Sequence, residues 1–289
     1  MRDIFIEELI EATKKNRNII LLVNDLGFGV IESFRRQFPN NCINAGISEQ
    51  SMAGYAAGLA AAGKHVFVYS IANFPTFRCA EQIRNDIDYH NLSVTIVSVG
   101  SGVGYGNLGY SHHGLQDYSL MRSFPNMLIA SPGDVMECRA CIRYLIKNPQ
   151  PSYLRLDKSS NYKIHDKIPT IYPGKWLEVL KKKNNKDSIY LTTGAVIEHV
   201  KNSFFKKKQE NLYSLPMWGM KFKKIQYNFT KKYKKIIVVE DHFQDGGFQS
   251  WLQESLNNKN SQTNIISKSI NYKIVGKVGS KEYLMNFLS

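Results

Sequence analysis

The sequence predicts an α/β protein built from two doubly wound, mostly parallel sheets. Short β-branched, apolar runs alternate with helical patterns, and these runs are continuously apolar, as in strands covered on both faces. Near residues 161–175 the chain turns polar and holds Pro169, Pro173 and Gly174, which indicates a linker. We therefore expect one unit over residues 1–160, the linker over 161–175 and a second unit over 176–289.

The elements follow in order from local patterns. Residues 1–16 form an amphipathic helix that carries acidic side chains. In the first unit, strands are expected at residues 18–23, 65–70, 93–99, 126–130 and 152–156, with helices near 48–62, 74–90, 116–123 and 134–147. In the second unit, strands are expected at 188–193, 211–215, 235–240 and 263–269, with helices beginning near 195 and 247.

Composition places the chain among folded globular proteins. Its 289 residues are 43% hydrophobic and 12% aromatic, which is enough to build large cores. No run of about 18 apolar residues occurs, so no membrane span is expected. The segment MRDIFIEELIEATKKN carries acids and lacks the pattern of a signal peptide, so we expect a cytoplasmic protein.

The net charge of +14 is concentrated in the second unit. Residues 1–160 hold 15 Lys and Arg against 14 Asp and Glu, whereas residues 161–289 hold 23 against 10. A nucleic-acid surface is one interpretation of this excess. No basic stripe interleaved with aromatic residues supports it, so we favour a solvated lysine-rich face without a nucleic-acid partner.

The four cysteines do not predict a metal site. Cys138 and Cys141 form a C-x-x-C pair inside a predicted helix, where positions three apart share a face. No second Cys or His cluster accompanies them, which disfavours zinc. We expect these two and Cys42 and Cys79 to be buried or partly buried thiols.

A glycine-rich segment, GSGVGYGNLGYSHHG at residues 100–114, follows the strand at 93–99. It contains G-x-G-x-x-G, but its third glycine does not lead directly into a helix, as a dinucleotide-binding loop requires. The segment suits a close approach of backbone to a ligand at the carboxyl end of a strand. Because neighbouring side chains on an extended loop point in opposite directions, one of His112 and His113 is expected to face that site.

A lone carboxylate, Glu49, stands in the small and apolar run NAGISEQSMAGYAAGLAAAG at residues 44–63. It lies at the head of a helix that is well suited to burial. One interpretation is an acid that interacts favourably with the helix dipole. The other is a functional carboxyl group in a buried site.

Four stretches together resemble the carboxyl-terminal half of transketolase, and more closely the small, separately encoded subunits of split transketolases. They are INAGISEQSMAGYAAGLAAAGKHVFVYS, NFPTFRCAEQIRND, GVGYGNLGYSHHGLQD and MRSFPNMLIASPGD. The G-I-x-E-Q motif followed by a glycine loop ending in Ser-His-His is a specific combination, and VVEDHFQDGGFQSWL resembles the family's last domain. The resemblance implies a pyrimidine-binding domain over residues 1–160 and a carboxyl-terminal transketolase domain over residues 176–289.

The resemblance also implies how the cofactor is held. In thiamine diphosphate enzymes of this family the glutamate of G-I-x-E-Q faces a ring nitrogen of the aminopyrimidine, and Glu49 occupies that position. Glu49 would share a proton with this nitrogen and act as a relay, while the cofactor carries out the carbon chemistry. Phe74 and Phe77 fall where the family places aromatic side chains against the aminopyrimidine, and Phe74 is the better candidate.

For the substrate, His112 matches the family's loop histidine that points at the sugar, where it can hydrogen-bond a hydroxyl or carbonyl group or move a proton. His113 takes a position that is usually glutamine, and we group it with the substrate-binding residues. Lys158 stands near the place of the family's second phosphate arginine, with Arg155 close by.

Two departures from the family pattern alter the sugar site. Leu108 stands where ordinary transketolases have an aspartate that contacts the sugar C2 hydroxyl. Gly100 stands where they have a histidine used on the acceptor phosphate. These changes argue against an ordinary pentose-phosphate pair and favour a specialised sugar, such as one made for a surface polysaccharide.

The family's motif for the diphosphate and magnesium, G-D-G followed by N-N, does not occur in the sequence. The chain is therefore expected to hold only the pyrimidine end of thiamine diphosphate. Magnesium and the diphosphate would be held by an amino-terminal partner subunit. The resemblance implies a homodimer of this chain within an α2β2 heterotetramer.

Two other functions stay open. The 2-oxo acid dehydrogenase β subunits and deoxyxylulose phosphate synthase share this domain pair and the glutamate but act as decarboxylating enzymes, and the Ser-His-His loop favours transketolase over them. A non-catalytic regulatory relative is the other alternative. The joint presence of Glu49, Phe74 and the histidine loop argues against it.

Overall fold

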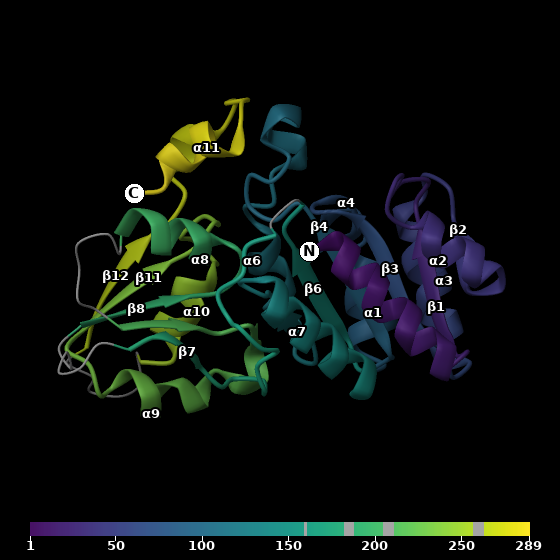
Figure 1. Ribbon diagram of the computed structural model, residues 1–289, viewed down its shortest axis with the longest axis horizontal. Helices are drawn as coiled ribbons and strands as arrows, with labels where there is room; N and C mark the ends of the chain where they lie inside the picture. The colour runs from purple at the N-terminus through teal and green to yellow at the C-terminus, as the bar shows by residue number, and fades with distance from the viewer. Residues whose placement is uncertain (159–160, 182–187, 205–210, 257–262) are drawn as a thin grey trace.

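Two sheets, each with helices on both faces, organise the chain into two units that lie side by side (Figure 1). The computed structural model describes residues 1–158, 161–181, 188–204, 211–256 and 263–289. The fold class predicted from the sequence is confirmed: both units are α/β and most neighbouring strands are parallel.

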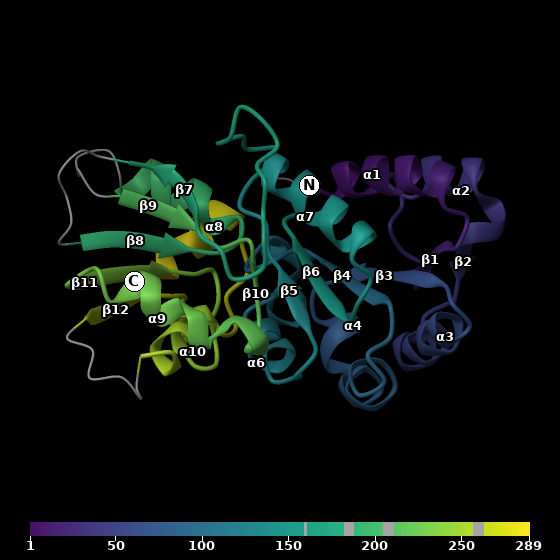
Figure 2. The ribbon, with the colours of Figure 1, turned by 90° about the horizontal axis from the view of Figure 1, so that it is seen from below.

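The first sheet has seven strands in the order β10-β5-β6-β4-β3-β1-β2. Their bounds are β1 Ile19–Val23, β2 Cys42–Asn44, β3 His65–Ile71, β4 Val94–Val99, β5 Leu128–Ala130, β6 Ser152–Leu156 and β10 Met217–Trp218. Only β10 is antiparallel to its neighbour, β5. In Figure 2, helices α1 (Arg2–Lys15), α2 (Glu32–Gln37) and α7 (Val135–Lys147) cover one face, and α3 (Glu49–Ala61), α4 (Phe74–Phe77) and α6 (Asp117–Met121) cover the other.

Burial on both faces explains why the strand sequences are continuously apolar. In β1, Leu21 belongs to the same buried apolar cluster as Phe5 of α1, whereas its neighbour Leu22 belongs to the cluster that contains Met52 of α3. Successive side chains of a strand point to opposite faces, so every residue of β1 meets a helix layer and all five are buried.

The second sheet has five strands in the order β12-β11-β8-β9-β7. Their bounds are β7 Leu177–Leu180, β8 Ser188–Thr192, β9 Asn211–Ser214, β11 Lys235–Val239 and β12 Asn264–Lys268, and β7 is antiparallel to β9. The helices of this unit are α8 Val196–His199, α9 Tyr227–Thr230, α10 Phe248–Glu254 and α11 Lys281–Leu284.

The helix expected at 74–90 differs from the prediction. It is divided into α4, α5 (Ala80–Gln82) and a π-helical turn at Ile83–Asp88. Pro75 fits the first turn of α4, where no helical partner is needed for its nitrogen. Cys79 leaves the helical region at φ −113° and ψ 12°, which separates α4 from α5.

The two units meet at a shared sheet edge. Strand β10 belongs to the second half of the chain, yet it pairs with β5 through Met217 opposite Ala130 and Trp218 opposite Ile129. The described residues between β6 and β7 form no helix or strand, but Ile164 and His165 donate backbone hydrogen bonds to Asp134. The connection is thus held against the first unit, and its bounds at 161–175 stay a prediction.

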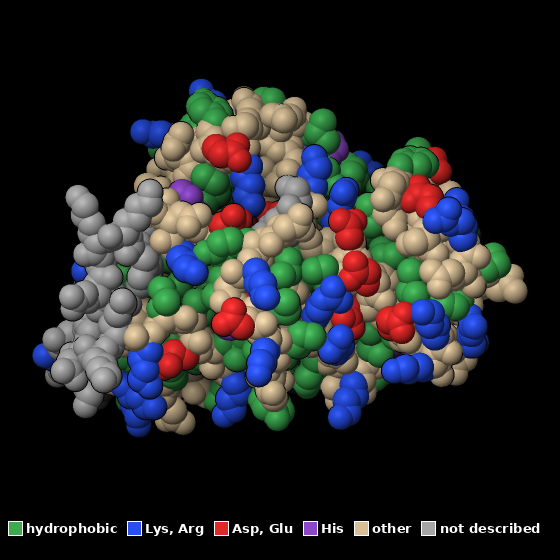
Figure 3. All heavy atoms as spheres, viewed as in Figure 1, with side chains coloured by type: hydrophobic (Ala, Val, Ile, Leu, Met, Phe, Trp, Pro, Cys, Tyr) green, Lys and Arg blue, Asp and Glu red, His purple; other side chains and the backbone are tan. Residues whose placement is uncertain are grey.

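The surface is mixed in character. On the face of the molecule seen in Figure 1, Figure 3 shows Lys and Arg side chains spread over the surface with acidic and apolar side chains between them. Within the described ranges, the helices are too short or too polar to cross a membrane. All four cysteines are free, and Cys79, Cys138 and Cys141 are buried, as expected.

Candidate active site

The predicted site residues gather at the carboxyl edge of the first sheet. Glu49 begins α3 shortly after β2, Phe74 begins α4 after β3, and His112 lies in the loop after β4. Open α/β sheets bind ligands at this edge, because the strand ends and helix starts meet there.

Glu49 is held at the head of α3 by a tight turn. Gly46 adopts φ +72°, and Ser48 donates its hydroxyl to Ala45 O at 2.7 Å. The helix buries small residues such as Ala53 and Ala56 against the sheet, which fixes the position of its first turn. Glu49 is only 6% exposed, so a carboxylate stands at a helix start with almost no contact with solvent.

The partner of Glu49 is Arg78. Arg78 Nη1 donates to Glu49 Oε1 at 2.8 Å, and its guanidinium carbon lies 4.3 Å from the centroid of the Phe74 ring. Arg78 therefore connects the predicted acid to the predicted aromatic residue. Phe77 is 46% exposed and Phe74 is only partly exposed, which favours Phe74 as the aromatic side chain that lines the site.

His112 also contacts Phe74. Their ring centroids are 5.1 Å apart in an edge-to-face contact, and Ser111 Oγ lies 3.0 Å from His112 Nδ1. Asn73 donates to the carbonyl oxygen of His113 at 2.6 Å and so ties the start of α4 to the glycine loop. Burial, together with the charge of Arg78, lowers the pKa of His112, which keeps the ring neutral near pH 7.

The neighbouring His113 is placed differently. It is fully buried, its ring meets Tyr110 edge-to-face at 6.4 Å, and burial lowers its pKa. The structure therefore does not bring His113 to the mouth of the site with His112. The burial of its ring favours a supporting role within the loop for His113 over substrate contact, and the assignment of one of the two histidines to a ligand stays a prediction.

Tyr105 connects Lys158 to this group. Lys158 Nζ lies 4.6 Å from the Tyr105 ring centroid, which is 6.3 Å from the ring of His112. Burial raises the pKa of Tyr105, and the charge of Arg2 near its hydroxyl partly offsets this. Lys158 thus places a cationic side chain over the Tyr105 ring, and the positive charge of Arg2 lies near the Tyr105 hydroxyl.

Gly100 makes room for Tyr105. A side chain at residue 100 would collide with the Tyr105 ring, and the backbone there has φ +93°. The glycine that stands in the place of the family histidine is therefore required by the loop's own packing. Leu108, the other departure, is exposed.

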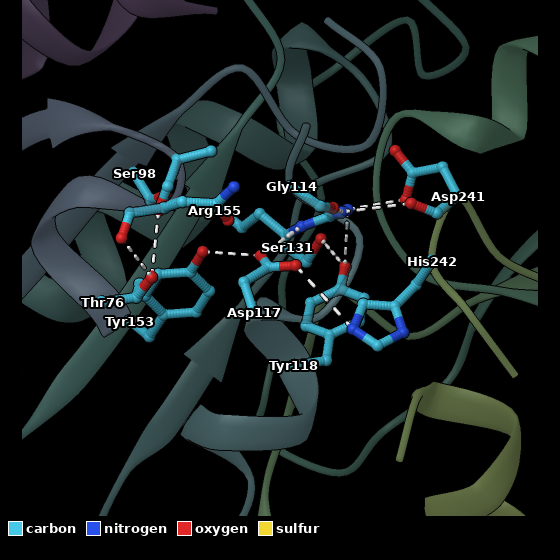
Figure 4. A network of polar contacts seen from close by, with 12 residues as sticks. Thr76, Ser98, Gly114, Asp117, Tyr118, Ser131, Tyr153, Arg155, Asp241 and His242 are labelled. Atoms are coloured by element: carbon cyan, nitrogen blue, oxygen red, sulfur yellow. Dashed lines mark hydrogen bonds and ion pairs between the residues drawn. The ribbon is translucent and has the colours of Figure 1, made fainter. Parts of the chain in front are cut away.

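Arg155 does not belong to the open site. It is fully buried between the units, where Nε donates to Asp117 Oδ2 at 2.7 Å and Nη1 donates to Asp241 Oδ1 at 2.6 Å (Figure 4). Nη2 donates to Gly114 O at 2.7 Å, at the end of the glycine loop, and the guanidinium lies over the ring of Tyr118. Arg155 thus joins the loop to the second unit, and its guanidinium is not presented to the open site.

A second polar cluster consists of Asp134, Glu137 and His165, whose ligand atoms lie within 4.8 Å of one another. Asp134 accepts four backbone N–H groups, from Met136, Glu137, Ile164 and His165. Glu137 accepts from Gly133 N and Ser214 Oγ, and its other oxygen lies 3.0 Å from His165 Nε2. These bonds already use the carboxylate oxygens, so the cluster acts as a hydrogen-bonded joint between the connection and both units.

Sequence reasoning missed Arg78, Tyr105 and Arg2. Arg78 follows the predicted aromatic positions directly, but in a predicted helix it was indistinguishable from a solvated surface residue. The only sequence signal for Tyr105 was the glycine at residue 100, where the family pattern has a side chain.

The fold and the site define a class: an α/β protein that gathers a buried acid, an aromatic side chain and a histidine loop at the carboxyl edge of a parallel sheet. Residues 1–163 match the family described as transketolase, pyrimidine binding domain. The chain therefore belongs to the transketolase family.

Similar proteins agree with this assignment. The chain is 31% identical over 259 residues to a subunit of apulose-4-phosphate transketolase from Actinobacillus succinogenes, covering 88% of this chain and 82% of that one. It is 30% identical over 291 residues to the putative transketolase C-terminal section of Methanocaldococcus jannaschii, covering 99% and 91%. A solved structure described as split gene transketolase, inactive beta4 tetramer, superposes with a TM-score of 0.81 at 25% identity, covering 99% and 91%. The resemblance to carboxyl-terminal subunits of split transketolases is confirmed.

Proposed function

We propose that this chain is the pyrimidine-binding subunit of a thiamine diphosphate-dependent enzyme that transfers a two-carbon ketol unit between sugars. The observation that carries the proposal is the group of Glu49, Phe74 and His112 at one edge of the first sheet, with Glu49 buried and both rings partly exposed. Family membership supports it, as do the relatives named as parts of transketolases.

The residues present fit the aminopyrimidine end of the cofactor. A buried carboxyl group suits a protonated ring nitrogen, and the Phe74 face suits a flat ring, as its contact with the planar guanidinium of Arg78 illustrates. When bound, the cofactor supplies the carbanion that carries the ketol unit. Glu49 would hold and exchange the proton at its carboxyl oxygen, and His112 would hydrogen-bond the sugar oxygen or accept a proton from it.

The Tyr105 end of the site suits a substrate with an anionic group. Lys158 is the cation placed there by its contact with Tyr105, and Tyr105 fills the space that a side chain at residue 100 would take. A sugar phosphate is therefore the substrate class we propose, with an acceptor or donor other than the ordinary pentose phosphates. The Actinobacillus relative, named for apulose 4-phosphate, is consistent with such a specialised substrate.

A partner subunit would complete the site. Strongly exposed apolar side chains lie in the loops that follow β1 and β2 and on α3: Phe28 at 78%, Ile47 at 79% and Tyr55 at 58%. Exposed apolar side chains of this size mark interaction surfaces. We propose that they contact a diphosphate- and magnesium-binding subunit and a second copy of this chain in an α2β2 assembly.

The test is reconstitution. The isolated chain should be a homo-oligomer by light scattering, bind thiamine diphosphate weakly by calorimetry, and lack ketol transfer. Mixing it with a polypeptide that carries the G-D-G and N-N motif should give an α2β2 complex that transfers ketol units from a ketose phosphate. Turnover by the isolated chain would contradict the need for a partner, and release of CO2 from a 2-oxo acid by the complex would favour the decarboxylating alternative.

A further inference from the structure

Arg78 makes two contacts at once, and both belong to the candidate cofactor site. It donates to the nearly buried carboxylate of Glu49 at 2.8 Å, and its guanidinium lies 4.3 Å from the Phe74 ring centroid. The Arg78 side chain itself is 51% exposed, whereas that of Glu49 is 7% exposed. The guanidinium thus enters the site from the solvent side and covers the acid and the aromatic ring together.

The guanidinium resembles the ring that these residues would hold. It is planar, it presents N–H donors in its plane, it carries positive charge, and it stacks on aromatic rings. A protonated aminopyrimidine offers Glu49 and Phe74 the same combination of an in-plane N–H donor and a flat face. The ring face of Phe74 that Arg78 covers cannot hold a second planar group, and Glu49 Oε1 is already bonded to Arg78, so the two groups compete for this position.

We infer that Arg78 is an internal occupant of the pyrimidine site, which the cofactor ring must displace before it can bind. The inference rests on the proposed function, because it takes Glu49 and Phe74 as the residues that receive the ring. It assigns Arg78 a role in keeping the partner-free subunit closed to its cofactor.

The local backbone allows Arg78 to leave. It lies between α4, which ends at Phe77, and α5, which begins at Ala80, so no long helix has to unwind when it moves. Removing it without a replacement would leave the buried carboxylate of Glu49 without its ion-pair partner, which is costly. Arg78 therefore satisfies Glu49 until another donor arrives.

The contacts indicate the size of the competition. A half-exposed ion pair and an exposed cation–π contact together lower the affinity of the site for a competing ligand by roughly five- to thirtyfold. This is small enough for the complete cofactor, which has a second end held elsewhere, to overcome. It is large enough to measure with a ligand that carries only the ring.

The experiment is a titration of the full chain with thiamine, which lacks the diphosphate. Binding is monitored by NMR, because this method can measure millimolar dissociation constants. Arg78→Gln should bind thiamine about five- to thirtyfold more tightly than wild type. Arg84→Gln is the matched control, because Arg84 follows six residues later and both side chains of its 3.3 Å ion pair with Glu81 are exposed; this variant should bind thiamine as wild type does. Adding Glu49→Gln to Arg78→Gln should abolish the gain.

Equal or weaker binding by Arg78→Gln overturns the inference. If that weaker binding still depends on Glu49, the pyrimidine site stands and Arg78 is one of its ligands instead. If Glu49→Gln changes nothing in any background, the proposed site itself is wrong. A measurement on wild type tests the inference even if the variants fail to fold. Saturating thiamine should shift the side-chain Nε–H resonance of Arg78 to that of a solvated guanidinium. An unchanged resonance also overturns the inference.

Discussion

Replacing Arg155 by methionine tests whether the buried ion cluster joins the two units. The guanidinium is fully buried and bonds Asp117, Asp241 and the carbonyl oxygen of Gly114 at 2.6 to 2.7 Å. Methionine has a similar length but leaves two buried carboxyl groups without their counter-ion. Breaking a buried ion pair in this way costs about 3–5 kcal/mol of unfolding free energy, which corresponds to a fall in Tm of roughly 6–20 °C.

The assay is urea and thermal unfolding of Arg155→Met beside Arg84→Met, whose arginine is exposed and should cost about 1 kcal/mol or less. Because carboxyl groups buried without a cation bind protons more tightly when folded, Arg155→Met should regain stability as the pH falls from 8 to 5. Adding Asp117→Asn and Asp241→Asn should recover part of the loss. Equal stabilities of Arg155→Met and Arg84→Met would refute the reasoning.

Three further outcomes are expected. Glu49→Gln should fold normally but lower turnover of the reconstituted enzyme at least about a hundredfold, and near-normal turnover would remove the relay role. His112→Ala should impair sugar turnover more than cofactor affinity, measured by steady-state kinetics and calorimetry; the reverse pattern would assign it to the cofactor. The hydrogen bond to Glu137 raises the pKa of His165 above 6.5, so its contribution to stability is complete below that pH and is lost as the pH rises through the folded pKa. Urea unfolding between pH 6 and 8 should show this loss in wild type, and a His165→Gln variant with the same pH dependence would contradict it.

The sequence was sufficient for the features that depend on local pattern. Strands such as β1 are apolar at every position because helices cover both faces, and that pattern is visible without coordinates. The position of Glu49 at the head of α3 follows from the small, apolar run behind it. The division of residues 74–90 into three pieces was not visible, since only Pro75 signals it and proline is also common inside a first turn.

Features that depend on partners distant in the sequence could not be predicted. Arg155 meets Asp117 and Asp241, which are 38 and 86 residues away, so its burial is decided by the packing of the two units. Arg78 meets Glu49 across 29 residues. Strand β10 has two residues, too few for any periodicity, and its place in the first sheet is set by pairing with β5.

The pairing of β10 with β5 has a consequence for synthesis of the chain. Translation proceeds from the amino terminus, so β5 leaves the ribosome well before its outer neighbour at Met217–Trp218. At roughly 5–20 residues per second, the interval between β6 and β10 lasts on the order of several seconds. During that time the backbone N–H and C=O groups on the outer side of β5 have no neighbouring strand with which to form hydrogen bonds. An unpaired strand edge of this kind can pair with the same edge of another nascent chain. A fragment that stops after residue 163 would keep this exposed edge permanently, and we expect it to be recovered as aggregate although it contains every predicted ligand of the aminopyrimidine.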